Sequence, residues 1–220
     1  MTAFDFVRSS IAAAAIIASS SLSGCAAPKT LAYQSVQDAR VLDEFRIDGR
    51  IDAATLDGAV GVVVLEFGRG GVGIGLTVGH GVAIRRIGDR WSPPVPLDFV
   101  SGSIGLQIGG EGGRIVMVFR DTAAFEGFIF DGAKFLAEAS GTAWTTKGAA
   151  GDPLAPEAVE VISSVGGLYG GAVVGGFGVS VDRSMMRDAY GEEATPRQVL
   201  DDRGVEIPAG AATLWRSLDG

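Results

Sequence analysis

The chain has 220 residues, which is enough for one domain with a sizeable core. Its 18 Lys and Arg against 26 Asp and Glu give a formal charge of −8, which argues against nucleic acid as a partner because phosphates require a basic surface. One histidine and one cysteine cannot form a Cys/His zinc cluster, a His-pair metal site or an internal disulfide, so no metal and no cofactor is expected.

Residues 1–24 are predicted to be a lipoprotein signal peptide. The apolar stretch from Ile11 to Leu22 is shorter than the roughly 20 residues that span a bilayer, but it has the length of a signal-peptide core. Leu22-Ser23-Gly24-Cys25 then resembles the bacterial lipoprotein box, in which the chain is cut before the cysteine and the thiol carries a diacylglyceryl group. We therefore expect an acylated Cys25, with fatty acids such as palmitate, followed by a tether over residues 25–30.

This anchor predicts a cell-envelope protein. Two or more acyl chains hold a protein stably at a membrane, whereas one does not. Ala26 stands where lipoproteins of the inner membrane commonly have Asp, so we expect the outer membrane, with the domain facing the periplasm. An ordinary secretory signal with an incidental cysteine is the alternative interpretation.

The first predicted element after the tether is a helix over residues 31–45, which Gly49 would end. Residues 59–67 are rich in β-branched side chains and predict a buried strand. In residues 71–86, glycines and apolar residues alternate, so one face of the strand would be apolar and the other bare. A bare face lets a ligand or another backbone approach closely.

A turn at 79–81, containing His80, would interrupt this segment. The pattern recurs in residues 102–119, where a turn at 111–113 predicts a hairpin, and again in residues 165–182. Short helices are predicted in between and afterwards, over residues 122–130, 156–164, 183–190 and 196–200, with another near Leu214 and Trp215.

These elements predict an α+β fold: a single β-rich domain of antiparallel Gly-rich strands and hairpins with short flanking helices. The domain would cover residues 31–202, and residues 203–220 would form a C-terminal tail.

Five segments, in this order, resemble the SYLF domain: GVGIGLTVGHGVAIRR, RWSPP, GSIGLQIGGEGGRIVMVF, GGLYGGAVVGGFGVSVD and AYGEEATPRQVL. The similarity covers about residues 60–200. It implies a non-enzymatic module that binds membrane lipids, with anionic or phosphoinositide-like headgroups as ligands in eukaryotic members. Gly166 occupies the position where the family usually has a lysine, which weakens the expectation of headgroup binding there.

The candidate lipid-binding residues are the basic and aromatic side chains between positions 69 and 91: Arg69, Arg85, Arg86, Arg90 and Trp91. Guanidinium groups suit phosphate, and a tryptophan ring suits the headgroup interface of a bilayer. Consecutive residues of a strand face opposite sides, so Arg85 and Arg86 would not share one face. The alternative is a solvated hairpin end with a core tryptophan.

No catalytic residue is predicted. His80 has no Ser or Asp motif that would pair with it. Residues 68–73 fit GxGxxG, but strand-like alternation continues where a dinucleotide site needs a helix N-terminus.

Two hypotheses therefore remain. In the first, the SYLF-like domain of an envelope lipoprotein binds membrane lipid. In the second, the glycine-faced sheet docks an envelope protein, and lipid contact is made only through Cys25. The oligomeric state does not follow from the sequence.

Overall fold

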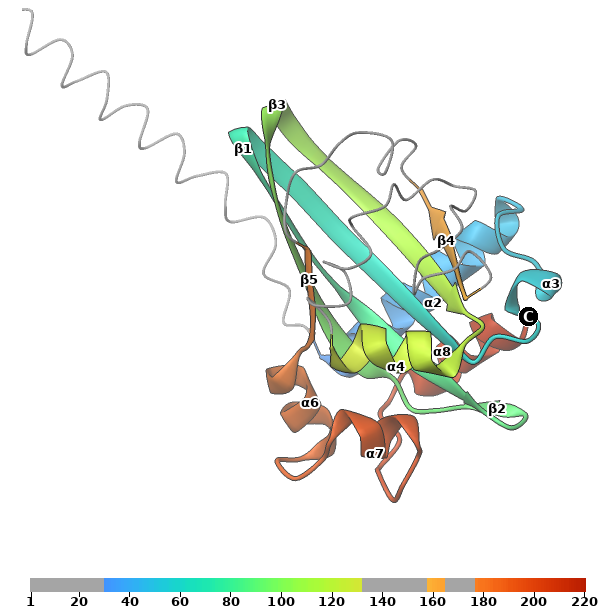
Figure 1. Cartoon of the computed structure of the whole chain (residues 1–220). Helices are drawn as coiled ribbons and strands as arrows, with labels where there is room; N and C mark the ends of the chain where they lie inside the picture. Colours follow the sequence, from blue (N-terminus) through green and yellow to red (C-terminus); the bar gives the residue numbers. More distant parts are fainter. Residues whose placement is uncertain (1–29, 132–157, 165–176) are drawn as a thin grey trace, which may run out of the picture.

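A long two-stranded antiparallel ribbon forms the centre of the fold (Figure 1). The computed structural model describes residues 30–131, 158–164 and 177–220. Three short strands extend the ribbon into a five-stranded antiparallel sheet. The strands are β1 (Gly61–Ile87), β2 (Arg90–Trp91), β3 (Val95–Phe119), β4 (Val159–Ser163) and β5 (Phe177–Val181). With its helices, this sheet confirms the predicted α+β class.

The ribbon folds back on itself, so that the two ends of β1 lie side by side. Arg86 N donates a hydrogen bond to Val60 O at 2.9 Å. A Cβ atom at Gly79 would lie 2.5 Å from Glu66 O, and one at Gly81 would overlap the carbonyl of Val64. Figure 1 shows the ribbon rising from the helices and returning to them. In this part of β1, the predicted bare glycine face is approached by the chain's own backbone.

Both predicted turns within the Gly-rich segments are wrong. His80 lies inside β1 opposite Asp98, and Gly112 lies inside β3 opposite Gly68. The chain instead reverses after Ile87, where Gly88 has a φ of +59° and connects β1 to β2. The glycines at the predicted turns lie in the extended strands of the ribbon, whereas Gly88 lies in the left-handed region that favours glycine.

The helix predicted over 156–164 is also wrong, because residues 159–163 form β4. Val159 pairs with Phe119 and Ser163 with Ile115, at the end of β3. The sequence Val-Glu-Val-Ile-Ser alternates and is rich in β-branched residues, so pairing with an open strand edge overrides its helical spacing.

Short helices flank the sheet, and the predicted ones at 31–45, 122–130, 183–190, 196–200 and near 214–215 are confirmed. They are α2 (Leu31–Ile47), α3 (Ala53–Leu56), α4 (Thr122–Phe130), α6 (Arg183–Tyr190), α7 (Pro196–Leu200) and α8 (Ala211–Asp219). Side chains cap several N-termini, such as Thr30, which accepts a hydrogen bond from Tyr33 N.

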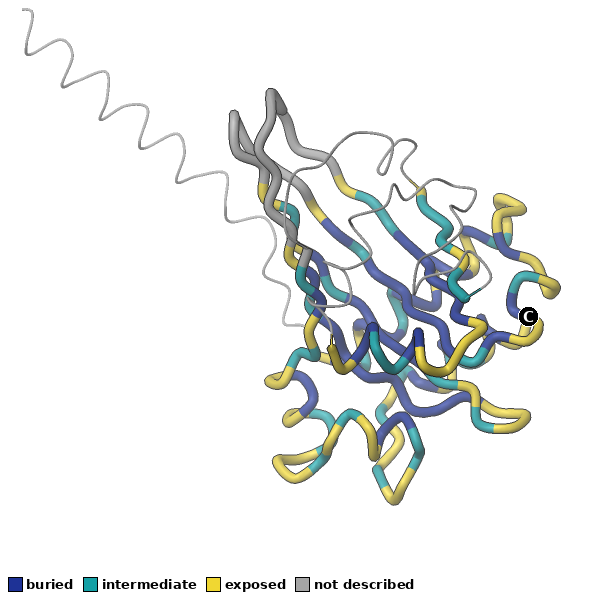
Figure 2. The backbone as a smooth tube through the Cα atoms, in the orientation of Figure 1, coloured by how far each residue is buried: buried dark blue, intermediate teal, exposed yellow. Residues whose placement is uncertain are grey.

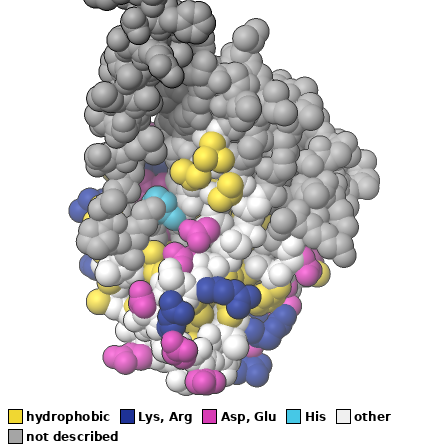
Figure 3. Space-filling model, turned by 90° about the vertical axis from the view of Figure 1, so that its left-hand side faces the viewer, with side chains coloured by type: hydrophobic (Ala, Val, Ile, Leu, Met, Phe, Trp, Pro, Cys, Tyr) yellow, Lys and Arg dark blue, Asp and Glu magenta, His cyan; other side chains and the backbone are white. Residues whose placement is uncertain are grey.

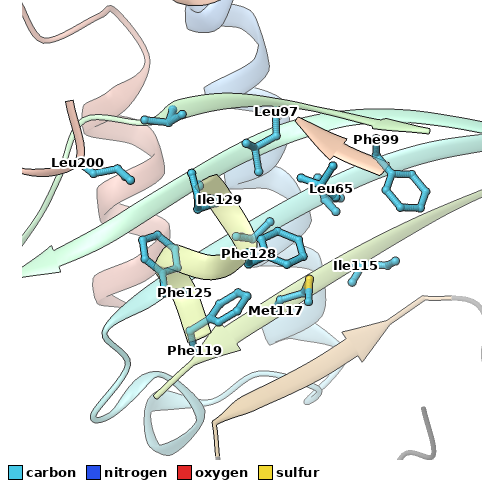
Figure 4. Close-up of a cluster of buried hydrophobic side chains, with 14 of the residues drawn as sticks. Leu65, Leu97, Phe99, Ile115, Met117, Phe119, Phe125, Phe128, Ile129 and Leu200 are labelled. Atoms are coloured by element: carbon cyan, nitrogen blue, oxygen red, sulfur yellow. The ribbon is translucent and has the colours of Figure 1, made fainter. Parts of the chain in front are cut away.

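Alternation along the ribbon produces two cores, one on each face. Figure 2 shows that the buried residues of the ribbon lie in the part of it next to the helices. On one face, Leu65 and Met117 pack with Phe125 and Phe128 of α4 (Figure 4). On the other, the buried strand residues pack with α2 and α8: Val62, Val64, Val116 and Val118. Leu214 of α8 is fully buried in this second core. The segment expected to be a tail thus contains a helix that packs on the sheet.

Candidate functional site

The predicted arginines are divided between two faces of the sheet. Arg86 lies opposite Trp91 and Ile87 opposite Arg90, so Arg86 and Trp91 share one face while Arg85 and Arg90 share the other. Arg69 lies sixteen residues before Arg85 along β1, opposite Glu111, and its side chain is outside the described residues. The structure therefore does not bring these side chains together in one patch.

Arg85 and Arg90 are bound to carboxylates of the helical layer. Arg85 Nη1 contacts Glu126 Oε1 of α4 at 3.2 Å and Asp201 Oδ1, just after α7, at 3.0 Å. Arg90 forms an ion pair with Asp202. These contacts fasten the ribbon to α4 and α7, and they compete with any phosphate for both guanidinium groups.

We therefore expect Arg85→Ala to reduce stability. Removing this half-buried guanidinium leaves the Asp201 and Glu126 carboxylates without it, and we expect the free energy of unfolding to fall by about 1–2 kcal/mol. Urea unfolding followed by circular dichroism measures the change. Arg203→Ala is the matched control: Arg203 also contacts Asp201, at 3.0 Å, but its side chain is 73% exposed, so the expected change is below about 0.5 kcal/mol. Equal losses in both variants would contradict the structural role of Arg85.

Arg86 and Trp91 form a separate assembly. The Arg86 guanidinium carbon lies 4.7 Å from the centre of the Trp91 ring, which is a cation–π contact. Trp91 is 2% exposed, and its Nε1 donates to Asp219 Oδ1 of α8 at 2.9 Å. Trp91 is thus a core residue, as in the alternative interpretation, while Arg86 remains exposed.

An exposed apolar patch on the ribbon is the other notable surface. It consists of Leu76, Val78 and Val100, each about half exposed. Val78 lies directly opposite Val100, and the pair His80–Asp98 borders them on the same face. Figure 3 shows hydrophobic side chains gathered next to the histidine on this side of the molecule. We call these three residues the ribbon patch.

Sequence reasoning missed the ribbon patch because alternation alone assigns apolar residues to a core. Further along the same face of β1, Val82 and Ile84 are buried in the core formed with α2 and α8. Leu76 and Val78 continue that face past the part that is buried. The length of the ribbon relative to the helices, which the sequence pattern does not give, decides this exposure.

Several predicted features lie outside the described residues: the signal peptide with Cys25, the tether except Thr30, and Gly166 with most of the third Gly-rich segment. Within the described ranges, no helix has the length and apolarity needed to cross a membrane. In the same part of the chain, no group of three or more His, Cys, Asp or Glu is placed to hold a metal ion.

The comparisons with known proteins identify the family. A family model described as "Ysc84: Las17-binding protein actin regulator" matches residues 100–220, a segment that includes α4 and every helix after it. No curated protein and no solved structure gives a significant match. Because the matched segment is more than half of the chain and agrees with the resemblance noted in the sequence, the protein belongs to the Ysc84 (SYLF) family of binding domains.

Proposed function

We propose that this protein is an envelope lipoprotein, acylated at Cys25 and held at the outer membrane facing the periplasm, whose SYLF domain binds membrane lipid. The lipoprotein box supports the anchor, and the family supports a binding domain. The observation that carries lipid binding is the ribbon patch, where three neighbouring apolar side chains are held in the open by a regular sheet.

The patch suits the boundary between headgroups and acyl chains. Transferring each half-exposed Leu or Val side chain into the bilayer contributes about 1 kcal/mol. This is too little to hold a protein at a membrane alone, but it suffices to orient a domain that acyl chains already tether. The patch would thus set which face of the domain meets the bilayer.

Charge contributes little to this mode of binding. Arg85 and Arg90, the cations expected to contact headgroups, are paired with Glu126, Asp201 and Asp202. The net charge of −8 also opposes approach to an anionic surface. We therefore expect association with neutral vesicles as well as anionic ones, and weak dependence on salt.

Val78→Asp is expected to abolish most of this association. The substitution removes the central apolar side chain of the patch and places a charge where the bilayer would be, so the vesicle-bound fraction should fall at least about fivefold. The measurement is flotation of protein beginning at Ala26, without acyl chains, against millimolar phosphatidylethanolamine or phosphatidylglycerol vesicles at low and high salt.

Ile207→Asp is the matched control, because Ile207 is 52% exposed, close to the 51% of Val78, but lies outside the patch. Circular dichroism checks that both variants are folded. Flotation that is equal for the two variants would remove the ribbon patch from the lipid-binding surface.

A protein partner at the same patch is the second candidate function. It is favoured by the acidic charge of the chain and by the family description, which names a Las17-binding protein. Absence of flotation by the unacylated protein on either kind of vesicle would favour this candidate and leave Cys25 as the proposed membrane contact.

A further inference from the structure

A second surface lies at the C-terminal end of β1, away from the ribbon patch in the middle of that strand. A cleft of about 410 Å³ opens between the end of α2, α3, the end of β1 and the end of α8. Figure 1 shows α3 beside the C-terminal end of α8 in this region. The residues that line it include Arg46, Leu56, Asp57, Arg86, Leu218 and Asp219. Leu56 and Leu218 are buried, so the cleft has an apolar floor and a charged rim.

Arg86 is held in position before any ligand arrives. Its guanidinium lies over the ring of Trp91, which is itself buried and tied to Asp219 through Nε1. Stacking uses the face of the guanidinium and leaves the N–H groups at its edge free to donate in the plane. Among the described residues, no carboxylate forms an ion pair with Arg86, in contrast to Arg85 on the opposite face. A ligand that binds these N–H groups therefore causes little further loss of side-chain entropy at Arg86.

Arg46, in the last turn of α2, supplies a second cation to the cleft. Its ion pair with Asp43 is 3.8 Å long and half exposed, so a stronger acceptor can displace it. Asp57 and Asp219 are also among the lining residues, so the side-chain charge of the lining is balanced, and Asp219 Oδ1 accepts the hydrogen bond of Trp91 Nε1. Such a lining does not favour a simple anion, because each carboxylate repels it.

We propose that this cleft binds a small phosphate ester that also carries an ammonium group. The phosphate would accept hydrogen bonds from Arg86 and Arg46, and the ammonium would contact Asp57 on the rim. The cleft volume lies within the range of about 300–1,000 Å³ found for small-ligand sites. Both an aminophospholipid headgroup and a free phosphorylated amine have this chemistry. The site is independent of the ribbon patch, since no residue is shared.

Calorimetric titration of the full chain in a non-ionic detergent tests the site. Glycerophosphoethanolamine carries both charges, whereas glycerol 3-phosphate lacks the ammonium. We expect Arg86→Ala to weaken glycerophosphoethanolamine binding at least about tenfold, because the preorganised fork is lost. Asp57→Asn should weaken glycerophosphoethanolamine but leave glycerol 3-phosphate unchanged or tighter. Arg203→Ala, a remote exposed arginine, is the control and should change neither.

No binding of glycerophosphoethanolamine at millimolar concentration would overturn the proposal, and so would equal binding by the wild type and the folded Arg86→Ala variant. An Asp57→Asn effect of the same sign on both probes would overturn the ammonium contact. Competition by phosphatidylethanolamine vesicles would assign the ligand to a lipid headgroup, and the absence of competition to a free molecule. Val78→Asp should leave binding of the soluble probe unchanged, so this proposal and the ribbon patch can fail separately.

Discussion

Gly81→Ala is expected to cost the domain about 4 kcal/mol or more, or to prevent it from folding. An added Cβ would overlap the carbonyl oxygen of Val64 and lie 2.9 Å from the Cα of Leu65. Both are backbone atoms of the neighbouring part of β1, so no side chain can turn away to make room. The two parts of the strand would have to separate, which opens the cores on both faces of the ribbon.

Gly68→Ala is the matched control for this prediction. Gly68 lies in the same strand, but a Cβ there would meet no atom within 4 Å. Alanine also reduces the freedom of the unfolded chain, so we expect no loss of stability or a gain of up to about 1 kcal/mol. Urea unfolding monitored by circular dichroism compares the variants. Similar midpoints for Gly81→Ala and wild type would show that the two parts of β1 are not in close contact.

Local signals in the sequence were sufficient to predict most helices. Asp121, Asp182 and Thr195 each accept a hydrogen bond from a backbone N–H in the first turn of the helix that follows. Such caps depend only on residues three positions apart, so they can be read along the chain. The buried strand expected over residues 59–67 was equally local, and its side chains alternate between the two cores of the domain.

The fold-back of the ribbon could not be predicted, because it depends on contacts between distant parts of one strand. Gly79 and Gly81 look like turn residues in the sequence, but they are needed where Glu66 and Val64 pass over them. The assignment of residues 159–163 failed for a related reason. A short apolar segment fits both the helical period of 3.6 residues and the strand period of two. Pairing with the free edge of β3 makes this segment a strand.

The candidate site was limited in the same way. The sequence shows four arginines close together, but the acidic partners of Arg85 lie 41 and 116 residues away. Which carboxylates pair with Arg85 depends on where α4 and α7 pack. A count of the charges along the sequence does not give that packing. Arg86 belongs to this cluster and Trp91 follows it in the sequence, whereas the contact of Trp91 with α8 depends on the fold.

The second large expected effect is a change of stability with pH, and it comes from Asp38, which is buried in α2. Its side chain is fully buried, and Gln34 Nε2 donates to Oδ1 at 2.9 Å. Its Oδ2 atom has no hydrogen-bond partner in the described part of the chain. Burial raises the pKa of Asp38 well above its ordinary value of 3.8, and the nearby Glu66 carboxylate raises it further. The protonated form is therefore the one that fits the folded domain.

Stability should consequently fall as the pH rises. Below pH 3.8 the side chain is protonated in the folded and unfolded chains alike, and its favourable contribution is complete. Above that value the unfolded chain loses its proton first, and the contribution is lost as the pH rises through the raised pKa of the folded state. Asp38→Asn keeps the shape without the charge, so we expect it to be about 3 kcal/mol more stable than wild type at pH 8.

Unfolding by urea between pH 4 and pH 8 tests this expectation as the difference between variant and wild type, which removes the titration of all other groups. The difference should be small at pH 4 and grow toward pH 8. Asp43→Asn is the control on the same helix, since the Asp43 side chain is 54% exposed and the substitution removes a solvated charge rather than a buried one. A constant difference for Asp38→Asn across this range would mean that the Asp38 carboxyl has the same protonation state in the folded and the unfolded chain. A decreasing difference would mean that an unidentified cation stabilises the Asp38 carboxylate in the folded domain.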